Sequence, residues 1–199
     1  MHQPRKTAQQ ARSRATQEAI LEATARILES RGRAALTTNE IARRAGVSIG
    51  SLYQYFPNKQ AILATLIRDK RAELLAQMQA ALEEMAAQPP EQAIDALIRA
   101  GLMHQFSRPV LALELEYLEP QLALEAETAA LSEQMAQLVL VTIRRLHPAA
   151  DPAEARDVVA IVKGLLNAAA FAGESGGAPL IARCRRAVLG YLDRAKAPG

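Results

Sequence analysis

Basic side chains concentrate near the start of the chain, where they could bind a polyanion. Residues 1–60 contain ten Lys and Arg but only four Asp and Glu, which gives this segment a net charge of +6. Because the whole chain carries +3, the remaining residues carry −3. A basic segment beside a mildly acidic one indicates that only the first part has a polyanionic partner such as nucleic acid. The alternative is a chance grouping of solvated charges.

Polar residues at fixed spacing within this segment predict two short helices. In the run TTNEIARRAGVSIGSLYQYF, residues 37–56, Thr37 is followed by Glu40 at the spacing of a capping box, so a helix is expected to begin there. Gly46 suits the turn that ends this helix, because glycine adopts positive φ without a steric penalty. Ser48 is a good N-cap for a second short helix. Two short helices joined by a glycine turn predict a helix-turn-helix motif.

The motif has one apolar side and one side that is free to contact a partner. The apolar side, which would hold the two helices at a steep angle, consists of Ile41, Ala42, Ala45, Val47 and Leu52. Ile49, Ser51 and Tyr53 are then free to face outward. Gly50 would let the second helix approach a DNA groove closely, since it has no side chain.

The elements around the motif are all predicted to be helical. Period-two runs of β-branched and aromatic residues are scarce, and apolar residues recur at helical spacing instead. The sequence therefore predicts an all-α fold. Residues 1–11 are polar and basic and are expected to form a disordered arm. Beyond the motif, helices are expected at residues 12–31, 58–87, 91–105, 109–117, 121–146, 153–172 and 179–195.

The residues from Thr16 to Leu66 resemble the DNA-binding domain of the TetR family of bacterial transcriptional regulators (TetR/AcrR type). The resemblance rests on the stretches AILEATARILESRG, LTTNEIARRAGVSIGSLYQYFPNK and AILATLI, in this order and spacing. It implies an N-terminal three-helix DNA-binding domain at residues 12–57. It also implies a C-terminal helical domain for ligand binding and dimerisation at residues 58–199, of which residues 58–87 would be the connecting helix.

The resemblance also implies which residues contact DNA. Ile49, Gly50 and Ser51 match positions that meet base edges, while Tyr53 and Tyr55 match positions that bind phosphates. The complete set carried over in this way is Thr38, Asn39, Arg43, Arg44, Ser48, Ile49, Gly50, Ser51, Tyr53, Tyr55 and Lys59. Lys59 matches a lysine that binds phosphate at a helix N-terminus.

Few of these side chains can distinguish one base from another. Asn39 and Ser51 are the evident hydrogen-bonding readers, and Ile49 can contact a thymine methyl group. Much of the affinity is therefore expected to come from phosphate contacts, which makes binding strongly dependent on salt.

The last two expected helices, residues 153–172 and 179–195, carry apolar residues around most of their circumference. Such helices must be buried on several sides. They could pack within one protomer. Alternatively, they could form a four-helix interface in a homodimer, as the resemblance implies. Two-fold dimers are the commonest homo-oligomers, which favours the second alternative.

The resemblance places a pocket for a small-molecule effector among the helices of residues 91–146. The candidate lining residues are Met103, His104, Phe106, Leu113, Tyr117, Met135, Leu138 and Val139, although residues of this kind are more often plain core. Five acidic residues between Glu114 and Glu127 have no Lys or Arg among them and could meet a cationic ligand or form a solvated acidic face.

No catalytic or metal-binding pattern is present in the sequence. It lacks a phosphate-binding loop, an HExxH motif and a nucleophile elbow, so we expect neither an enzyme nor a cofactor. Cys184, the single cysteine, lies on an apolar helix face and is expected to be a buried small hydrophobe. With no secretory signal or membrane-length apolar run, a cytoplasmic location is expected.

The resemblance therefore implies a dimeric repressor that binds a palindromic operator and is released by a small molecule. A DNA-binding activator, or a regulator without ligand control, is the alternative. A helical-bundle enzyme or small-molecule carrier with an incidental basic helix is a third hypothesis, and it predicts no specific DNA binding.

Overall fold

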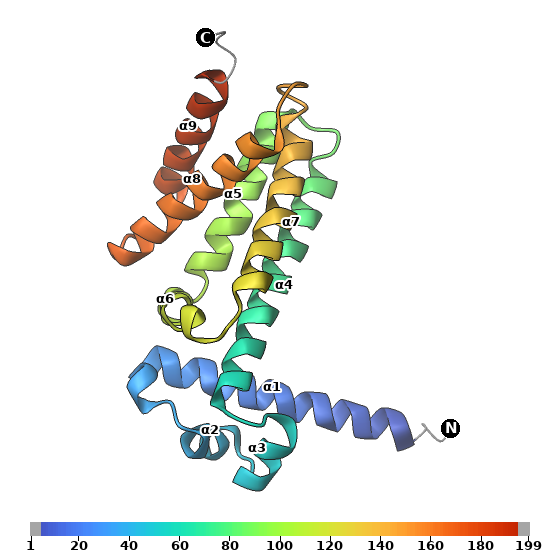
Figure 1. The fold of residues 1–199 in the computed structure, drawn as a ribbon, viewed down its shortest axis with the longest axis vertical. Helices are drawn as coiled ribbons and strands as arrows, with labels where there is room; N and C mark the ends of the chain where they lie inside the picture. The colour runs from blue at the N-terminus through green and yellow to red at the C-terminus, as the bar shows by residue number, and fades with distance from the viewer. Residues whose placement is uncertain (1–4, 195–199) are drawn as a thin grey trace. The chain divides into compact units, whose positions relative to one another are not determined.

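The structure, a computed structural model, describes residues 5–194 and is entirely helical over that range, as the sequence predicts. Figure 1 shows the helices in chain order. They are α1 (Arg5–Arg31), α2 (Thr38–Ala45), α3 (Ile49–Tyr55), α4 (Lys59–Glu84), α5 (Pro90–Phe106), α6 (Pro109–Leu118), α7 (Glu125–Ile143), α8 (Pro152–Phe171) and α9 (Ala178–Arg194), with 3₁₀ turns η1 (Arg33–Ala35) and η2 (Glu119–Gln121).

The starts of two helices differ most from the sequence prediction, and α4 and α7 each also end three residues earlier than expected. Helix α1 begins at Arg5 rather than near residue 12, so part of the expected arm is helical, and residues 1–4 lie outside the described residues. Helix α7 begins at Glu125 rather than at 121. Pro120 lies in the preceding 3₁₀ turn, and Ala123 has φ of 50°, a left-handed conformation through which an α-helix cannot continue.

The chain divides into two compact units. The first comprises the described residues up to Asp69 together with Glu114–Ala123. In it, α1 packs against α2 and η1, and α2 packs against α3. Its most deeply buried side chains are Ile20, Ile27, Leu28, Leu36, Ile41, Leu52 and Ile62. These residues come from α1 to α4, so one small apolar core fixes all the elements of the predicted motif.

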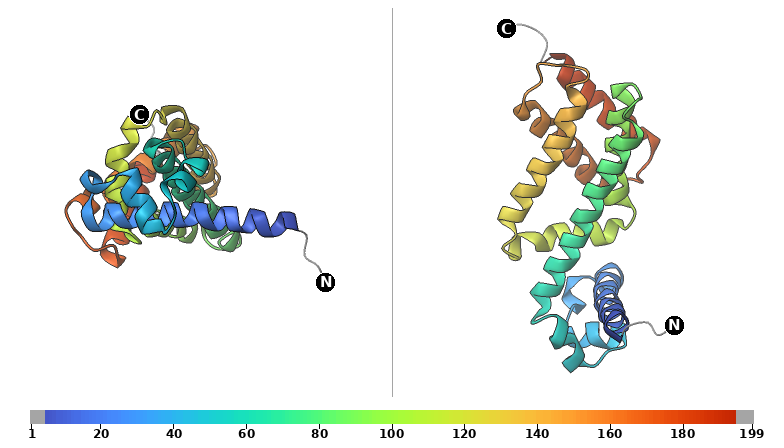
Figure 2. Two further views of the ribbon diagram at one scale, coloured as in Figure 1. Left: turned by 90° about the horizontal axis from the view of Figure 1, so that it is seen from below. Right: turned by 90° about the vertical axis from the view of Figure 1, so that its right-hand side faces the viewer.

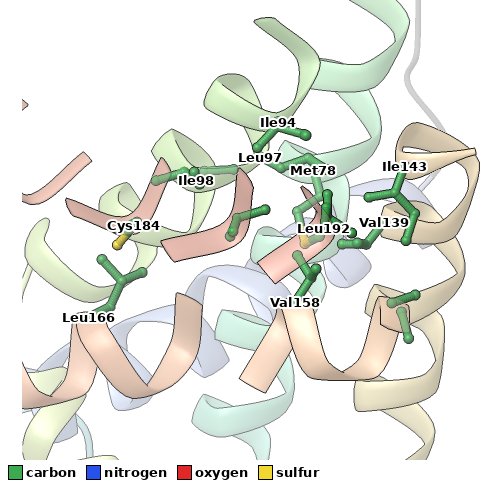
Figure 3. Packing of buried hydrophobic residues seen from close by; sticks show 14 of the residues in the cluster. Met78, Ile94, Leu97, Ile98, Val139, Ile143, Val158, Leu166, Cys184 and Leu192 are labelled. Carbon is green, nitrogen blue, oxygen red and sulfur yellow. The ribbon is translucent and has the colours of Figure 1, made fainter. Parts of the chain in front are cut away.

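The second unit comprises Lys70–Leu113 and the described residues from Leu124 onward. Helix α8 is central to it, because it packs against α5, α7 and α9. Figure 3 shows side chains of α4, α5, α7, α8 and α9 meeting in its core, among them Met78, Ile98, Val139, Val158 and Leu192.

Polar groups also join α8 and α9 at the edge of this core. The Tyr191 hydroxyl donates a hydrogen bond of 2.6 Å to Asp157 Oδ2. This hydrogen bond, followed by burial, raises the pKa of Tyr191 to about 12. Cys184 is completely buried in the core, as predicted, and burial raises the pKa of its thiol. A thiol that is both buried and protonated is chemically inert.

None of the helices from α1 to α9, within the described residues, is both long enough and apolar enough to cross a membrane.

Close packing of the loop between α8 and α9 gives a test of this unit. A Cβ atom at Gly176 would lie 2.6 Å from Cγ of Phe106, whereas one at Gly177 would meet only Pro179 Cδ, at 3.8 Å. Gly176→Ala is therefore expected to lower the free energy of unfolding by about 1–3 kcal/mol through overpacking. Gly177→Ala is the matched control. Urea unfolding followed by circular dichroism measures both, and equal midpoints would show that the loop does not pack on Phe106.

Candidate nucleic-acid interface

Helix α2 is bounded by local interactions of the predicted kind. Thr37 Oγ1 accepts a hydrogen bond of 3.2 Å from the backbone N–H of Glu40, and Gly46 ends the helix with φ of 69°. The prediction of a reciprocal capping box is only half right, however. The Glu40 carboxylate does not return to Thr37 but binds arginine side chains instead.

Helix α3 is held by a cap at its start and by one buried residue at its centre. Ser48 Oγ accepts a hydrogen bond of 3.0 Å from the Ser51 N–H and lies 2.8 Å from the Ser51 hydroxyl. Leu52 is completely buried and Phe56, which follows the helix, is nearly so. The helix is therefore fixed on one side, and its other side is free.

Of the three residues of α3 predicted to face outward, Ile49 and Tyr53 are exposed, whereas Ser51 is half-buried. Ile49 is 39% exposed and Tyr53 49% exposed, which is unusual for large apolar side chains, and Gly50 is also exposed. A Cβ atom at Gly50 would meet only Ser48 Oγ, at 3.9 Å, so the packing of this protomer does not require glycine there. Internal packing does not explain the glycine at this position, whereas the close approach of a partner would explain it.

A polar contact connects this side of α3 with the start of α2. The hydroxyl of Tyr53 lies 3.2 Å from Thr38 Oγ1. Asn39, the next residue of α2, is exposed. The structure therefore brings Thr38, Asn39 and Tyr53 to one surface, although they come from different helices.

The two arginines of α2 differ in a way that the sequence did not reveal. Arg43 binds Glu40 through two hydrogen bonds, of 2.9 and 2.6 Å, and Arg31 binds the same carboxylate at 2.9 Å. The hydrogen bonds from Arg43 hold the pKa of Glu40 below its usual value, with help from the charge of Arg31. Arg44 is exposed and has no ion-pair partner among the side chains that the structure describes. Its charge is therefore available to a ligand, whereas that of Arg43 is largely compensated.

Lys59, the first residue of α4, also has a role that sequence reasoning missed. Its Nζ donates a hydrogen bond of 3.1 Å to the backbone carbonyl of Leu36 and is half-buried. This bond ties the start of α4 to the loop before α2. An ammonium group has three donors, so two remain for an anion. Asn58 Oδ1 caps the same helix by accepting from the N–H of Ala61 at 2.8 Å.

Arg33 in η1 is a further residue that the sequence did not single out. Its guanidinium lies 3.6 Å from the centre of the Tyr117 ring and 3.4 Å from a carboxylate oxygen of Glu114. Glu114 is therefore paired, so the acidic residues of this stretch do not form one uniformly solvated face. No local sequence signal connects residues that are about eighty positions apart.

The eight predicted effector-binding residues are divided between the two compact units. Val139 is buried, and Phe106, Met135 and Leu138 pack around the same core. Leu113 and His104 are half-buried, and burial lowers the pKa of His104. Met103 is exposed, and Tyr117 belongs to the other compact unit, beside Arg33. Their role in ligand binding stays a prediction.

Among the described residues, no group of three or more His, Cys, Asp and Glu side chains is placed to hold a metal ion.

Comparisons with known proteins agree with this geometry. Residues 20–66 match the family model described as bacterial regulatory proteins, tetR family. The transcriptional regulator BetI of Rhizobium meliloti is 32% identical over 131 residues, which span 65% of this chain and 60% of BetI. The match therefore covers less than two thirds of the length of that relative.

Two solved structures are similar over almost their whole length. A TetR-family regulator from Streptomyces coelicolor aligns with a TM-score of 0.72 at 23% identity, covering 93% of this chain and 99% of that one. The multidrug-binding protein EbrR, solved with imidazole, aligns with a TM-score of 0.68 at 20% identity over 92% and 96% of the two chains. At these identities the structures establish the fold.

The cap of α3 gives a test that does not depend on any ligand. Ser48→Ala removes the acceptor for the Ser51 N–H and is expected to lower the free energy of unfolding by about 1 kcal/mol. Ser48→Asn keeps an acceptor at this position and is expected to restore most of that stability. Chemical denaturation of both variants measures the difference. If Ser48→Ala were as stable as the wild type, the cap would not hold the helix.

Proposed function

We propose that this chain, which belongs to the TetR family of bacterial transcriptional regulators, binds duplex DNA through α2 and α3 and represses transcription. The observation that carries the proposal is the surface of α3. An α-helix fits the major groove of B-form DNA, and α3 is fixed from behind by Leu52 while Ile49, Gly50 and Tyr53 remain exposed.

The contacts expected at this surface divide into two kinds. Ile49, Ser51 and Asn39 would meet base edges, because they combine a methyl-contacting side chain with two hydrogen-bonding ones. Phosphate contacts would come from Thr38, Tyr53, Tyr55, Lys59 and Arg44. Arg43 is less suited to this role than Arg44, since Glu40 already compensates its charge. Because phosphate contacts outnumber base contacts, affinity is expected to fall steeply with salt.

A homodimer would place two such surfaces on one operator. Half-sites then lie one helical turn apart, roughly 34–36 Å, or a multiple of it. Part of the apolar circumference of α8 and α9 is used within the protomer, where the two helices pack together. Among the exposed residues of α8, a row at helical spacing is small or apolar, and it consists of Ala160, Gly164, Ala168 and Phe171.

Two features of this face support its burial against a second copy of the chain. Phe171 is 69% exposed in the protomer, which leaves a large apolar ring in water. Gly164 lies inside a helix, where glycine costs about 1 kcal/mol relative to alanine, and no atom lies within 4 Å of where its Cβ would be. Small side chains let two helices approach closely, and a helix of a second copy that packs here would explain the glycine.

We further propose that a small molecule bound within α5 to α7 releases the operator. The multidrug-binding protein EbrR, which has a similar fold, was solved in complex with imidazole, and this supports the proposal. A ligand that favours a conformation with the wrong separation of the two α3 helices lowers DNA affinity by population shift. The alternative is an activator or a regulator without ligand control. If a small molecule weakens binding to the operator, the result supports ligand-induced release over constitutive binding.

Selection of genomic fragments with the purified protein, followed by salt titration, tests DNA binding. An inverted repeat is expected to be enriched. Lys59→Ala is expected to weaken binding and to reduce the slope of log K against log salt by about 0.9 for each phosphate that the lysine no longer neutralises. Lys163→Ala, an exposed change on α8, is the charge-matched control.

The outcomes of this selection separate two roles of Lys59. No enrichment of any duplex, with or without candidate effectors, would argue against the proposed function. An unchanged salt slope for Lys59→Ala would mean that this lysine serves only to bind the Leu36 carbonyl.

A second experiment tests the dimer. Phe171→Glu is expected to shift the protein to monomer in sedimentation velocity, because it places a charge at the proposed interface. Val141→Glu on α7 is the control, since Val141 is exposed to a similar extent, 66%, outside the proposed face. Retention of the dimer by Phe171→Glu would place the interface elsewhere.

A further inference from the structure

We propose that the N-terminal part of α1 forms a second DNA-contacting surface, in which Arg12 and Arg14 bind backbone phosphates that flank the bases read by α3. The inference rests on the proposed function and adds to it. None of the residues that the resemblance assigns to DNA lies on α1.

The position of Arg14 beside α3 is the first observation. An open groove of about 470 Å³ runs between α1, the end of α3 and the start of α4. Arg14 and Gln17 line it on the α1 side, and Tyr55 and Pro57 line it beside α3. Tyr55 is one of the residues expected to bind phosphate. A guanidinium on the opposite wall can therefore reach the same strand of DNA.

The pairing of the arginines in this unit is the second observation. Arg26 pairs with Glu22, Arg31 and Arg43 with Glu40, and Arg33 with Glu114. Arg12 and Arg14, by contrast, are exposed and have no ion-pair partner among the side chains that the structure describes. Among the described side chains of this unit, the cations without an acidic partner therefore include Arg12 and Arg14 on α1, Arg44 on α2 and Lys59 on α4.

The course of α1 is the third observation. The helix spans 27 residues, and Figures 1 and 2 show its N-terminal turns continuing past α3, with no other helix of this unit beside them. The match to the family model begins only at residue 20. Residues 1–17 contain four Lys and Arg and no Asp or Glu. This extension is therefore additional to the core of the motif, and its charge suits an anionic partner.

Backbone phosphate is the occupant that these groups fit best. Guanidinium groups bind phosphate oxygens through paired hydrogen bonds, and contacts to phosphate position a protein without reading sequence. Glu18, Arg68 and Asp69 also line the groove, and the two carboxylates would repel an anion deep inside it. The phosphates are therefore expected at the rim, on the exposed guanidinium of Arg14, and on Arg12, which lies two residues earlier and projects from a different side of α1.

Salt titration on two duplexes tests the inference. A random-sequence duplex suffices for the first, because phosphate contacts do not depend on sequence. The wild type, Arg12→Ala, Arg14→Ala and the double variant are compared with Arg26→Ala, which removes one exposed charge from the same helix. Each single variant is expected to reduce the salt slope by about 0.9 per protomer bound, and the double variant by about 1.8, whereas Arg26→Ala leaves the slope unchanged.

The second duplex is the selected operator with its flanks progressively shortened. Removal of the flanking phosphates is expected to weaken binding by the wild type and to leave the double variant unaffected. Urea midpoints equal to that of the wild type confirm that the variants are folded.

Three results would overturn the inference in distinguishable ways. Equal slopes for the double variant and the wild type, with Lys59→Ala still reduced, would reject the α1 surface and leave the proposed function intact. A reduction for Arg26→Ala equal to that for Arg14→Ala would indicate a general effect of charge. Failure of the wild type to bind either duplex would reject both proposals.

Discussion

The burial of Leu52 and Ile41 is the constraint on which the DNA-facing surface depends. Helix α3 has seven residues, and isolated helices of that length are not stable in water. Leu52 and Ile41 are both completely buried, and burial of such a side chain stabilises by roughly 1.5–3 kcal/mol. Leu52 fixes α3 against the core, while Ile49 and Tyr53 on the same short helix remain exposed.

The same small unit arranges its charges so that some are compensated and others are not. Glu40 binds Arg31 and Arg43, and Glu114 binds Arg33. Exposed ion pairs of this kind add little to stability, typically no more than about 1 kcal/mol. Their effect is on the distribution of charge, since Arg12, Arg14, Arg44 and Lys59 are described side chains of this unit that are left without an acidic partner. An electrostatic surface of this kind attracts DNA before any base is read.

The second unit has an exposed apolar face rather than an exposed set of charges. Helix α8 buries one side against α5, α7 and α9 and leaves a face of small residues and Phe171 exposed. Helices α4 and α6 each contribute residues to both compact units, so both helices run from one unit into the other. Under the proposed function, the contact of Arg33 with Glu114 and Tyr117 adds a side-chain connection between α6 and the segment preceding α2.

Much of the fold and of the candidate site could be predicted because the signals are local. Thr37, Gly46 and Ser48 set the helix ends through hydrogen bonds and backbone angles that involve residues at most a few positions apart, and apolar periodicity gave the remaining helices. Cys184 was predicted to be buried for the same reason. Where local signals misled, as at the start of α7, an unexpected left-handed Ala123 was responsible.

The partners of individual charged groups depended on tertiary structure instead. The sequence could not show that Glu40 would bind Arg31, that Lys59 would reach the Leu36 carbonyl, or that Arg33 would lie over Tyr117. Each of these contacts joins residues from different elements, and long flexible side chains have many possible partners of similar energy. Only the packing of the helices decides which of those partners lies within reach.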